Sequence, residues 1–463
     1  MKKLFIIYFL LFLAIPLVSA QEKELPPKGG EPKDFALPDR EEITLDNGLK
    51  IVLAPYGAIP KATIRMVVKT GNIHETENEI WLSDLVGSMM QEGTSEFNAK
   101  QLADKMARMG GDLNVFVNQH TANISSAVLY EFAPDAINLM AKVLTAPSFP
   151  ESELDRLKGN LKRNLSVALT RPRAQASASF YKGLYPDHAY GRIYPTQEMI
   201  DSYTVEQVNS FYDNQFGAKR TTVYVAGKFD RDKVINTIKN AFNTWKEGPE
   251  DTYPIATPAT FDNLTIQITD RPNAPQSTIY YGLPVADVSN SDYIALDVTN
   301  SLLGGSFGSR ITSNIREDKG YTYSPSSRLD NKYKSGIWME VADVTTEHTA
   351  ASLEEIKNEI IRLQNEPPSK EELAGIQNYE SGLFVLRNSS PGGIINQLVF
   401  IDIHDMDDSY LKNRVNNIMK LTPEDIQNMT KKYINPENMN LVIVGDKEKV
   451  EKQLKEKSIP IKD

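Results

Sequence analysis

The sequence predicts an α+β protein with two homologous domains, each an antiparallel-rich sheet packed with helices. The first observation is length, because 463 residues exceed what one hydrophobic core usually serves. The second is a pattern of helix and strand that occurs twice, a domain's length apart. The third is hydrophobic periodicity, which switches between the strand period and the helix period in the same order in both halves.

The repeat is clearest at the end of each half. In the first half a helix begins after Thr204 and leads into a β-rich strand that stops at Gly227. In the second half a helix begins after Thr422 and leads into a strand that stops at Gly445. Each threonine is a predicted N-cap, and a glutamate two residues later suits the positive end of a helix. The two halves are therefore predicted to be copies of one fold.

The remaining elements follow in matching order. Residues 42–53 predict a hairpin that turns at Asp46-Asn47-Gly48. The other predicted elements are a strand at 63–69 and helices at 79–91 and 98–109 in the first half, and strands at 264–269 and 276–283 and helices at 292–303 and 309–318 in the second half. The Pro- and acid-rich stretch 246–262 predicts a linker, which gives domains of 41–245 and 263–455.

The N-terminus predicts export. Residues 1–20 have a charged start, an apolar middle and small residues before Gln21, as in a cleaved signal peptide; the alternative is a membrane anchor. Residues 21–40 are rich in Pro, Gly and charge and predict a disordered lead-in. The absence of cysteine excludes disulfides and lipid attachment at the cleavage site. The expected location is the periplasm or the outside of the cell, with no membrane span in the mature chain.

The charge distribution argues against nucleic acid as a partner. The net charge is −10, and no block of basic residues interrupts it. The sequence also has no glycine-rich phosphate loop followed by Lys-Ser/Thr, no Gly-x-Ser-x-Gly elbow and no cysteine nucleophile. These classes of site are therefore not expected.

The order of several short motifs is similar to that of a known family. The motifs are GNIHE at 71–75, EGT at 92–94, GGDLN at 110–114, DHAYG at 187–191 and LLGG at 302–305. From about residue 40 to 450 the chain resembles the insulinase/pitrilysin (M16) family of zinc peptidases, in the small-subunit branch that includes the mitochondrial processing peptidase. The resemblance implies a duplicated M16-type fold and places the family's site residues on this sequence.

That placement implies a lost metal site. Active family members carry H-x-x-E-H on a helix: the two histidines bind Zn²⁺, the glutamate acts as general base, and a distant glutamate completes the metal shell. The resemblance places the histidine positions on Asp84 and Ser88, the base on Gly87 and the distant ligand on Asn164. Asp84 could ligate a metal, but serine and asparagine are poor zinc ligands and glycine has no side chain. No catalytic position is expected to be intact, and no metal is expected on this chain.

The spacing of the histidines does not provide a second pair of metal ligands on one helix. They are His74, His120, His188, His348 and His404, and no two are close enough to share a helical turn. We therefore expect surface or loop residues. A site folded from separate segments is the remaining alternative.

A second family motif is retained. By resemblance, Arg316 and Tyr323 are substrate-binding residues that hydrogen-bond a peptide carbonyl near the scissile bond. A guanidinium fork and a phenol O–H both donate toward a developing oxyanion, so the residue types suit that role. The structural alternative is an arginine at a helix end in a surface ion pair and a strand tyrosine in the core.

These observations give one leading hypothesis and two alternatives. The resemblance implies an inactive subunit of an M16-type peptidase assembly, which forms a peptide-holding chamber as a heterodimer with an H-x-x-E-H-bearing homologue. Zinc is then expected on the partner subunit only, and the substrate is an unfolded peptide. The alternatives are a structural or binding scaffold without a peptidase role, and a metal-dependent peptidase with a non-standard site.

Overall fold

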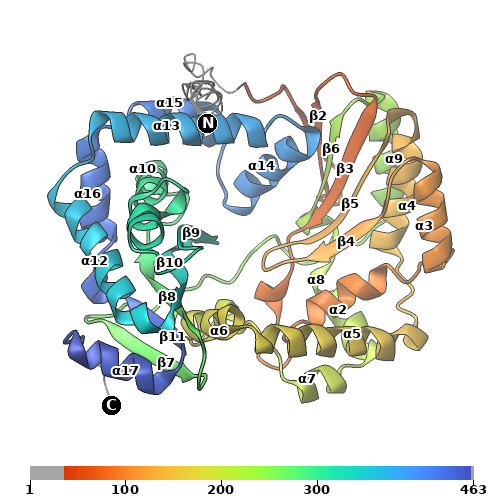
Figure 1. The fold of residues 1–463 in the computed structure, drawn as a ribbon. Helices are drawn as coiled ribbons and strands as arrows, with labels where there is room; N and C mark the ends of the chain where they lie inside the picture. The colour runs from red at the N-terminus through yellow and green to blue at the C-terminus, as the bar shows by residue number, and fades with distance from the viewer. Residues whose placement is uncertain (1–35, 460–463) are drawn as a thin grey trace, which may run out of the picture. The chain divides into compact units, whose positions relative to one another are not determined.

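A computed structural model describes residues 36–459, which form two β-sheets and the helices that pack on them (Figure 1). The predicted signal peptide and most of the predicted lead-in lie outside the described residues. Within residues 36–459 no helix is long and apolar enough to cross a membrane.

The first half forms a six-stranded sheet in the order β1-β2-β6-β3-β5-β4. β2 runs parallel to β6, and the other neighbours are antiparallel. The strands are β1 (Glu41–Thr44), β2 (Lys50–Pro55), β3 (Lys61–Val68), β4 (Asn114–Val117), β5 (Ala122–Leu129) and β6 (Thr221–Gly227). The helices are α2 (Leu82–Met90), α3 (Ala99–Arg108), α4 (Ala133–Thr145), α5 (Glu151–Thr170), α6 (Pro172–Leu184), α7 (Gln197–Ser202), α8 (Val205–Gln215) and α9 (Arg231–Phe242).

The second half forms a five-stranded sheet in the order β7-β11-β8-β10-β9. Its strands are β7 (Thr265–Asp270), β8 (Gln276–Val285), β9 (Ser326–Lys332), β10 (Ser335–Thr345) and β11 (Asn440–Gly445). The helices are α10 (Tyr293–Asn300), α11 (Arg310–Thr312), α12 (Thr349–Asn365), α13 (Lys370–Arg387), α14 (Pro391–Ile403), α15 (Ser409–Met419), α16 (Pro423–Tyr433) and α17 (Lys447–Glu456).

The two sheets have the same topology. In each, the last strand of the half lies between a parallel neighbour from the start of the half and an antiparallel neighbour: β6 lies between β2 and β3, and β11 lies between β7 and β8. The antiparallel hairpin then continues outward through β5 and β4, or through β10 and β9. This match confirms the predicted fold class of two homologous α+β domains.

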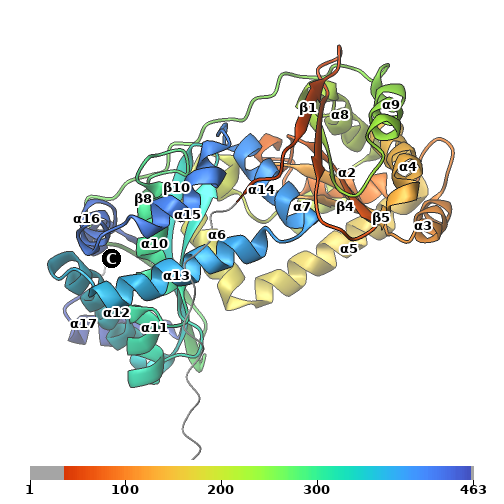
Figure 2. The same ribbon diagram turned by 90° about the horizontal axis from the view of Figure 1, so that it is seen from above.

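Each half sends one helix onto the sheet of the other half (Figures 1 and 2). α6 from the first half buries Phe180 and Leu184 against β8, β10 and β11. Its counterpart α14 buries Ile394 and Leu398 against β2, β3 and β6. This exchange holds the two sheets in one unit. The limits 41–245, 246–262 and 263–455 remain predictions, because packing crosses them.

The predicted repeat ends have the expected local chemistry. The Thr204 and Thr422 side chains accept from the backbone N–H groups of Gln207 and Asp425, and each forms a capping box. Gly227 ends β6 with φ +108°, and a Cβ there would lie 2.4 Å from Lys61 O. Glycine is therefore required at this position by both conformation and space.

The helices predicted at 292–303 and 309–318 differ in detail from the expectation. After α10 the chain widens into a π-helical segment, η5 (Ser301–Gly305), and after α11 into a second one, η6 (Ser313–Asp318). A Cβ on Gly304 would lie 2.6 Å from Ser327 Oγ, and one on Gly305 would lie 2.5 Å from Asn300 Nδ2. The widened turn thus packs its backbone directly on β9, which periodicity alone does not reveal.

Candidate functional site at the degenerate metal helix

The helix that carries the degenerate metal positions is α2, and Glu75 fixes its start. Trp81 precedes the helix with φ 69°, and its N–H donates to Glu75 Oε2 at 3.0 Å. The N–H of Ser83 donates to Glu75 Oε1 at 2.9 Å. Glu75 therefore caps the exposed N–H groups of the first turn from outside the helix. Glu75 belongs to the motif at 71–75, but its role as a helix cap depends on the fold and was not predicted.

The side-chain amide of Asn72 holds the carboxylate of Asp84. Asn72 Nδ2 donates to Asp84 Oδ2 at 2.7 Å and to Glu75 Oε1 at 3.1 Å. Burial raises the pKa of Asp84 to about 6 and the pKa of Glu75 to about 7. Both carboxyls therefore titrate near neutral pH because they are removed from water. Asn72 belongs to the same short segment, η1 (Asn72–His74), that precedes the helix.

The position of the general base is filled by a neighbouring strand. A Cβ on Gly87 would lie 2.8 Å from Val117 Cγ2 and 3.8 Å from Val115 Cγ1, both on β4. A glutamate would need that space. Asn164 lies on α5 with an exposed side chain, and Ser88 is half-buried on α2. The residues present do not fit zinc, since the donors are poor and the space for a base is closed.

The histidines do not assemble a replacement site. Among the described residues, no group of three or more His, Cys, Asp or Glu side chains could hold a metal ion. His348 is exposed and stacks on Tyr321 at 4.3 Å, and His188 Nδ1 accepts from Tyr190 N at 3.2 Å.

His404 lies in a turn after α14, as the expectation of surface or loop residues allows, but it is buried, and His74 and His120 are partly buried. His404 is 4% exposed, and its ring centroid lies 6.4 Å from that of His120. His120 Nε2 bonds with Tyr190 OH at 2.8 Å, and His74 Nε2 lies 3.2 Å from Thr252 O. Burial lowers the pKa of His74 and His404 to about 4 and that of His120 to about 3. His74 and His120 have polar partners from distant segments, which the sequence alone does not reveal.

Arg316 and Tyr323 lie on the second half, outside any buried core. Arg316 lies in the last turn of η6, where its Nη1 donates to Glu317 Oε1 at 2.7 Å. Its guanidinium lies 4.4 Å from the ring centroid of Phe307, which is 74% exposed. Tyr323 is 87% exposed, so the alternative of a core tyrosine is wrong. The ion pair of Arg316 matches the other part of that structural alternative, but its Phe307 neighbour was not foreseen.

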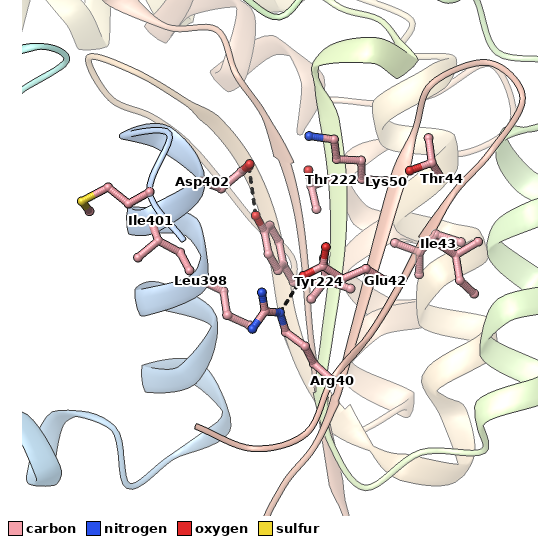
Figure 3. Close-up of a pocket in the computed structure, with 13 residues that line it drawn as sticks. Arg40, Glu42, Ile43, Thr44, Lys50, Thr222, Tyr224, Leu398, Ile401 and Asp402 are labelled. Carbon is pink, nitrogen blue, oxygen red and sulfur yellow. Dashed lines mark hydrogen bonds and ion pairs between the residues drawn. The ribbon is translucent and has the colours of Figure 1, made fainter. Parts of the chain in front are cut away.

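A pocket between the first sheet and α14 is separate from these residues (Figure 3). It measures about 210 Å³, and its floor is two rows across neighbouring strands, Glu42–Val52–Tyr224 and Thr44–Lys50–Thr222. Tyr224 OH donates to Asp402 Oδ2 at 3.2 Å, and Arg40 bonds Glu42 at 2.7 Å. The Tyr224–Asp402 bond joins the first sheet to α14, so the pocket is part of the contact between the halves.

Comparisons with known proteins agree with this geometry. The model "Insulinase (Peptidase family M16)" matches residues 51–193, and "Peptidase M16 inactive domain" matches residues 202–379. A Bacillus subtilis protein named as the uncharacterized zinc protease YmxG is 25% identical over 75% of this chain and 84% of its own length. A Helicobacter pylori protein named as the non-peptidase homolog YmxG is 21% identical over 84% of this chain and 90% of its own length.

The fold is also that of a solved structure. The crystal structure of a peptidase M16 inactive domain from Pseudomonas fluorescens has a TM-score of 0.80 and 22% identity, and it covers 88% of this chain and 98% of its own. The two family models together extend across both halves. The chain therefore belongs to the peptidase M16 (insulinase) family, and its sequence lacks the H-x-x-E-H motif.

Proposed function

We propose that this chain is the catalytically silent subunit of an M16-type peptidase assembly. It closes a peptide-holding chamber with a zinc-bearing H-x-x-E-H homologue, in a heterodimer where zinc resides on the partner only. The proposal includes export to the periplasm or beyond by the N-terminal signal peptide. The substrates are unfolded peptides, which the partner hydrolyses.

One contrast carries this proposal. The metal face of α2 is closed, because Val117 occupies the space beside Gly87. In the second half the Tyr323 side chain is exposed, and the guanidinium of Arg316 is more than a quarter exposed beside Phe307. A chain that retained its fold for scaffolding alone has no need to expose these donors. Their exposure supports a role in holding substrate for a catalytic centre on another chain.

The sheet edges support peptide binding by strand addition. β4 is the last strand of the first sheet and pairs only with β5. It lies on α2 through Val115 and Val117, so an added strand would run beside the degenerate metal helix. Main-chain pairing at an edge accepts many sequences, which suits unfolded substrates.

Reconstitution with the H-x-x-E-H homologue of the same organism tests the proposal. Each purified chain and their mixture are assayed with unfolded peptides, and complex formation is followed by size-exclusion chromatography. We expect a stable complex and activity in the mixture that exceeds the partner alone by about 10-fold or more, since the partner alone lacks half of the orienting groups. Equal activity of the partner alone and of the mixture would refute the proposed function.

A further inference from the structure

A buried lysine joins the two sheets at the ends of two edge strands. Lys332 ends β9 and is 5% exposed. Its Nζ donates to Gln119 Oε1, which belongs to the turn between β4 and β5, and it pairs with Asp330 Oδ2 at 3.0 Å. The rings of Tyr181 and Tyr190 lie 5.0 and 5.2 Å from the ammonium. The cation therefore spans from the second half to the first.

Charge at this position is not an efficient source of stability. Removing an ammonium group from water costs several kcal/mol, and an apolar side chain of similar volume often serves the fold as well. A buried charged group can instead favour one arrangement of the fold, because the buried charge is tolerated only where its hydrogen-bonding and ionic partners are in place. Lys332 meets such partners in Gln119, Asp330 and two aromatic rings.

The turn that Lys332 reaches is fixed from several sides. The backbone N–H groups of Asn72 and Ile73 donate to the carbonyls of Asn118 and Gln119 at 3.2 and 2.9 Å. Tyr253 OH, from the stretch between the two halves, donates to His120 O at 2.8 Å. The turn is thus bonded to η1, whose Asn72 side chain holds Asp84 on α2.

The same strand connects to the retained substrate-binding pair. β9 begins at Ser326, three residues after Tyr323, and ends at Lys332. β4 and β9 each form one of the two edges of their sheets, and the Lys332–Gln119 bond joins the C-terminal end of β9 to the turn that follows β4. This contact therefore ties the turn after β4 to β9, the strand whose opposite end follows Tyr323.

We propose that Lys332, acting through Gln119, is a positioning residue that sets the β4 edge and the Arg316–Tyr323 segment at the spacing one extended peptide can engage at once. This inference rests on the proposed function. A peptide paired on β4 presents its carbonyls at fixed positions, so donors on the other half are useful only when the spacing is right. In enzymes, a misplacement of the orienting groups by about 1 Å can lower the reaction rate by up to about 100-fold.

The test uses the mature chain and a fluorescent unfolded peptide, with binding followed by anisotropy. Gln119→Ala removes the acceptor without altering the buried lysine, and Gln119→Glu retains an acceptor for Lys332. We expect Gln119→Ala to weaken binding by about 10-fold and Gln119→Glu to restore it. Lys357→Met, which removes a solvent-exposed lysine paired with Glu437, is the matched control and should not change binding.

A double-mutant cycle separates positioning from a merely structural role. If Lys332 and Gln119 place Arg316, then Arg316→Ala should weaken binding in the native chain but have little further effect in the Gln119→Ala chain. Additive losses, or unchanged binding in Gln119→Ala while Arg316→Ala weakens it, would overturn this inference and leave the proposed function standing. If neither variant changes binding or the activity of the two-chain mixture, this inference fails together with the substrate-holding part of the proposed function, and the chain then acts on the partner by assembly alone.

Discussion

Val117 Cγ2 lies 2.8 Å from the point that a Cβ on Gly87 would occupy. Gly87 is buried in the middle of α2, where glycine is unfavourable by about 1 kcal/mol relative to alanine. The strand β4 therefore packs closer to this helix than any side chain at position 87 would permit. The glycine at the position of the catalytic glutamate and the close approach of β4 are one structural feature, because a larger residue at position 87 requires Val117 or β4 to move.

Gly87→Ala should destabilise the chain although alanine favours helices. The added methyl group meets Val117, a stiff β-branched side chain, and overpacking of this kind costs about 1–3 kcal/mol, which exceeds the gain in helix propensity. Urea unfolding should show a net loss of about 1 kcal/mol. The double variant Gly87→Ala with Val117→Ala should lose less stability than the sum of the two single variants, because the methyl group then has room. A more stable Gly87→Ala chain would contradict the close packing.

Stability should depend on pH through Asp84. Burial raises its pKa to about 6 in the folded chain, above the usual value for aspartate, so the folded state binds the proton more tightly than the unfolded state. Proton binding by Asp84 therefore stabilises the folded chain at low pH, and this stabilisation is lost as the pH rises through about 6. Asp84→Asn removes this loss, and its free energy of unfolding should exceed that of the native chain by about 1–3 kcal/mol at pH 8.

The advantage of Asp84→Asn should vanish near pH 4, where the native carboxyl is protonated. Asp135→Asn, at an exposed position on α4, provides the control and should show no such pH-dependent gain. Denaturant titrations at pH 4, 6 and 8 measure all three proteins. A constant difference between Asp84→Asn and the native chain across this range would show that Asp84 keeps one charge state.

The duplicated fold could be predicted because its signals are local. Capping threonines such as Thr204 and Thr422 and strand-ending glycines such as Gly227 act through their own backbone and nearest neighbours. The exchange of α6 and α14 between the sheets could not be predicted, since an amphipathic helix shows that it has a buried face but not which sheet covers it. The π-helical turns were missed for the same reason: Gly304 packs on Ser327, which comes much later in the chain.

The candidate site likewise has one part that the sequence predicts and one part that it does not. The missing ligands at Asp84, Gly87 and Ser88 can be read directly, because a residue type either can or cannot bind zinc. The reasons for each replacement depend on distant segments, as with Val117 against Gly87. The burial of His404 is likewise a property of tertiary packing, since it lies at the end of an exchanged helix.

The two capping boxes should contribute similarly to stability. Thr204 and Thr422 each accept an N–H bond in the first turn of α8 or α16, at 3.3 and 3.2 Å. Replacing either threonine with alanine leaves that donor without its protein partner and should cost about 1 kcal/mol. Thermal or urea unfolding measures each variant. Thr196 accepts the N–H of Met199 at the start of the shorter helix α7 without a capping box, and Thr196→Ala provides a third comparison outside the repeat.

Arg316→Ala and Tyr323→Phe should separate activity from stability. Tyr323 is largely exposed, and the ion pair of Arg316 with its neighbour Glu317 lies at the surface, so neither change should alter the free energy of unfolding by more than about 0.5 kcal/mol.

In the two-chain assembly each variant removes a donor to the substrate carbonyl, and kcat/KM should fall by about 10- to 100-fold with complex formation unchanged. Arg108→Ala and Tyr379→Phe, at exposed positions on α3 and α13, control for loss of any surface arginine or tyrosine hydroxyl. Full activity in both variants would identify Arg316 and Tyr323 as remnants of an ancestral site, and the chain would then act on the partner by assembly alone.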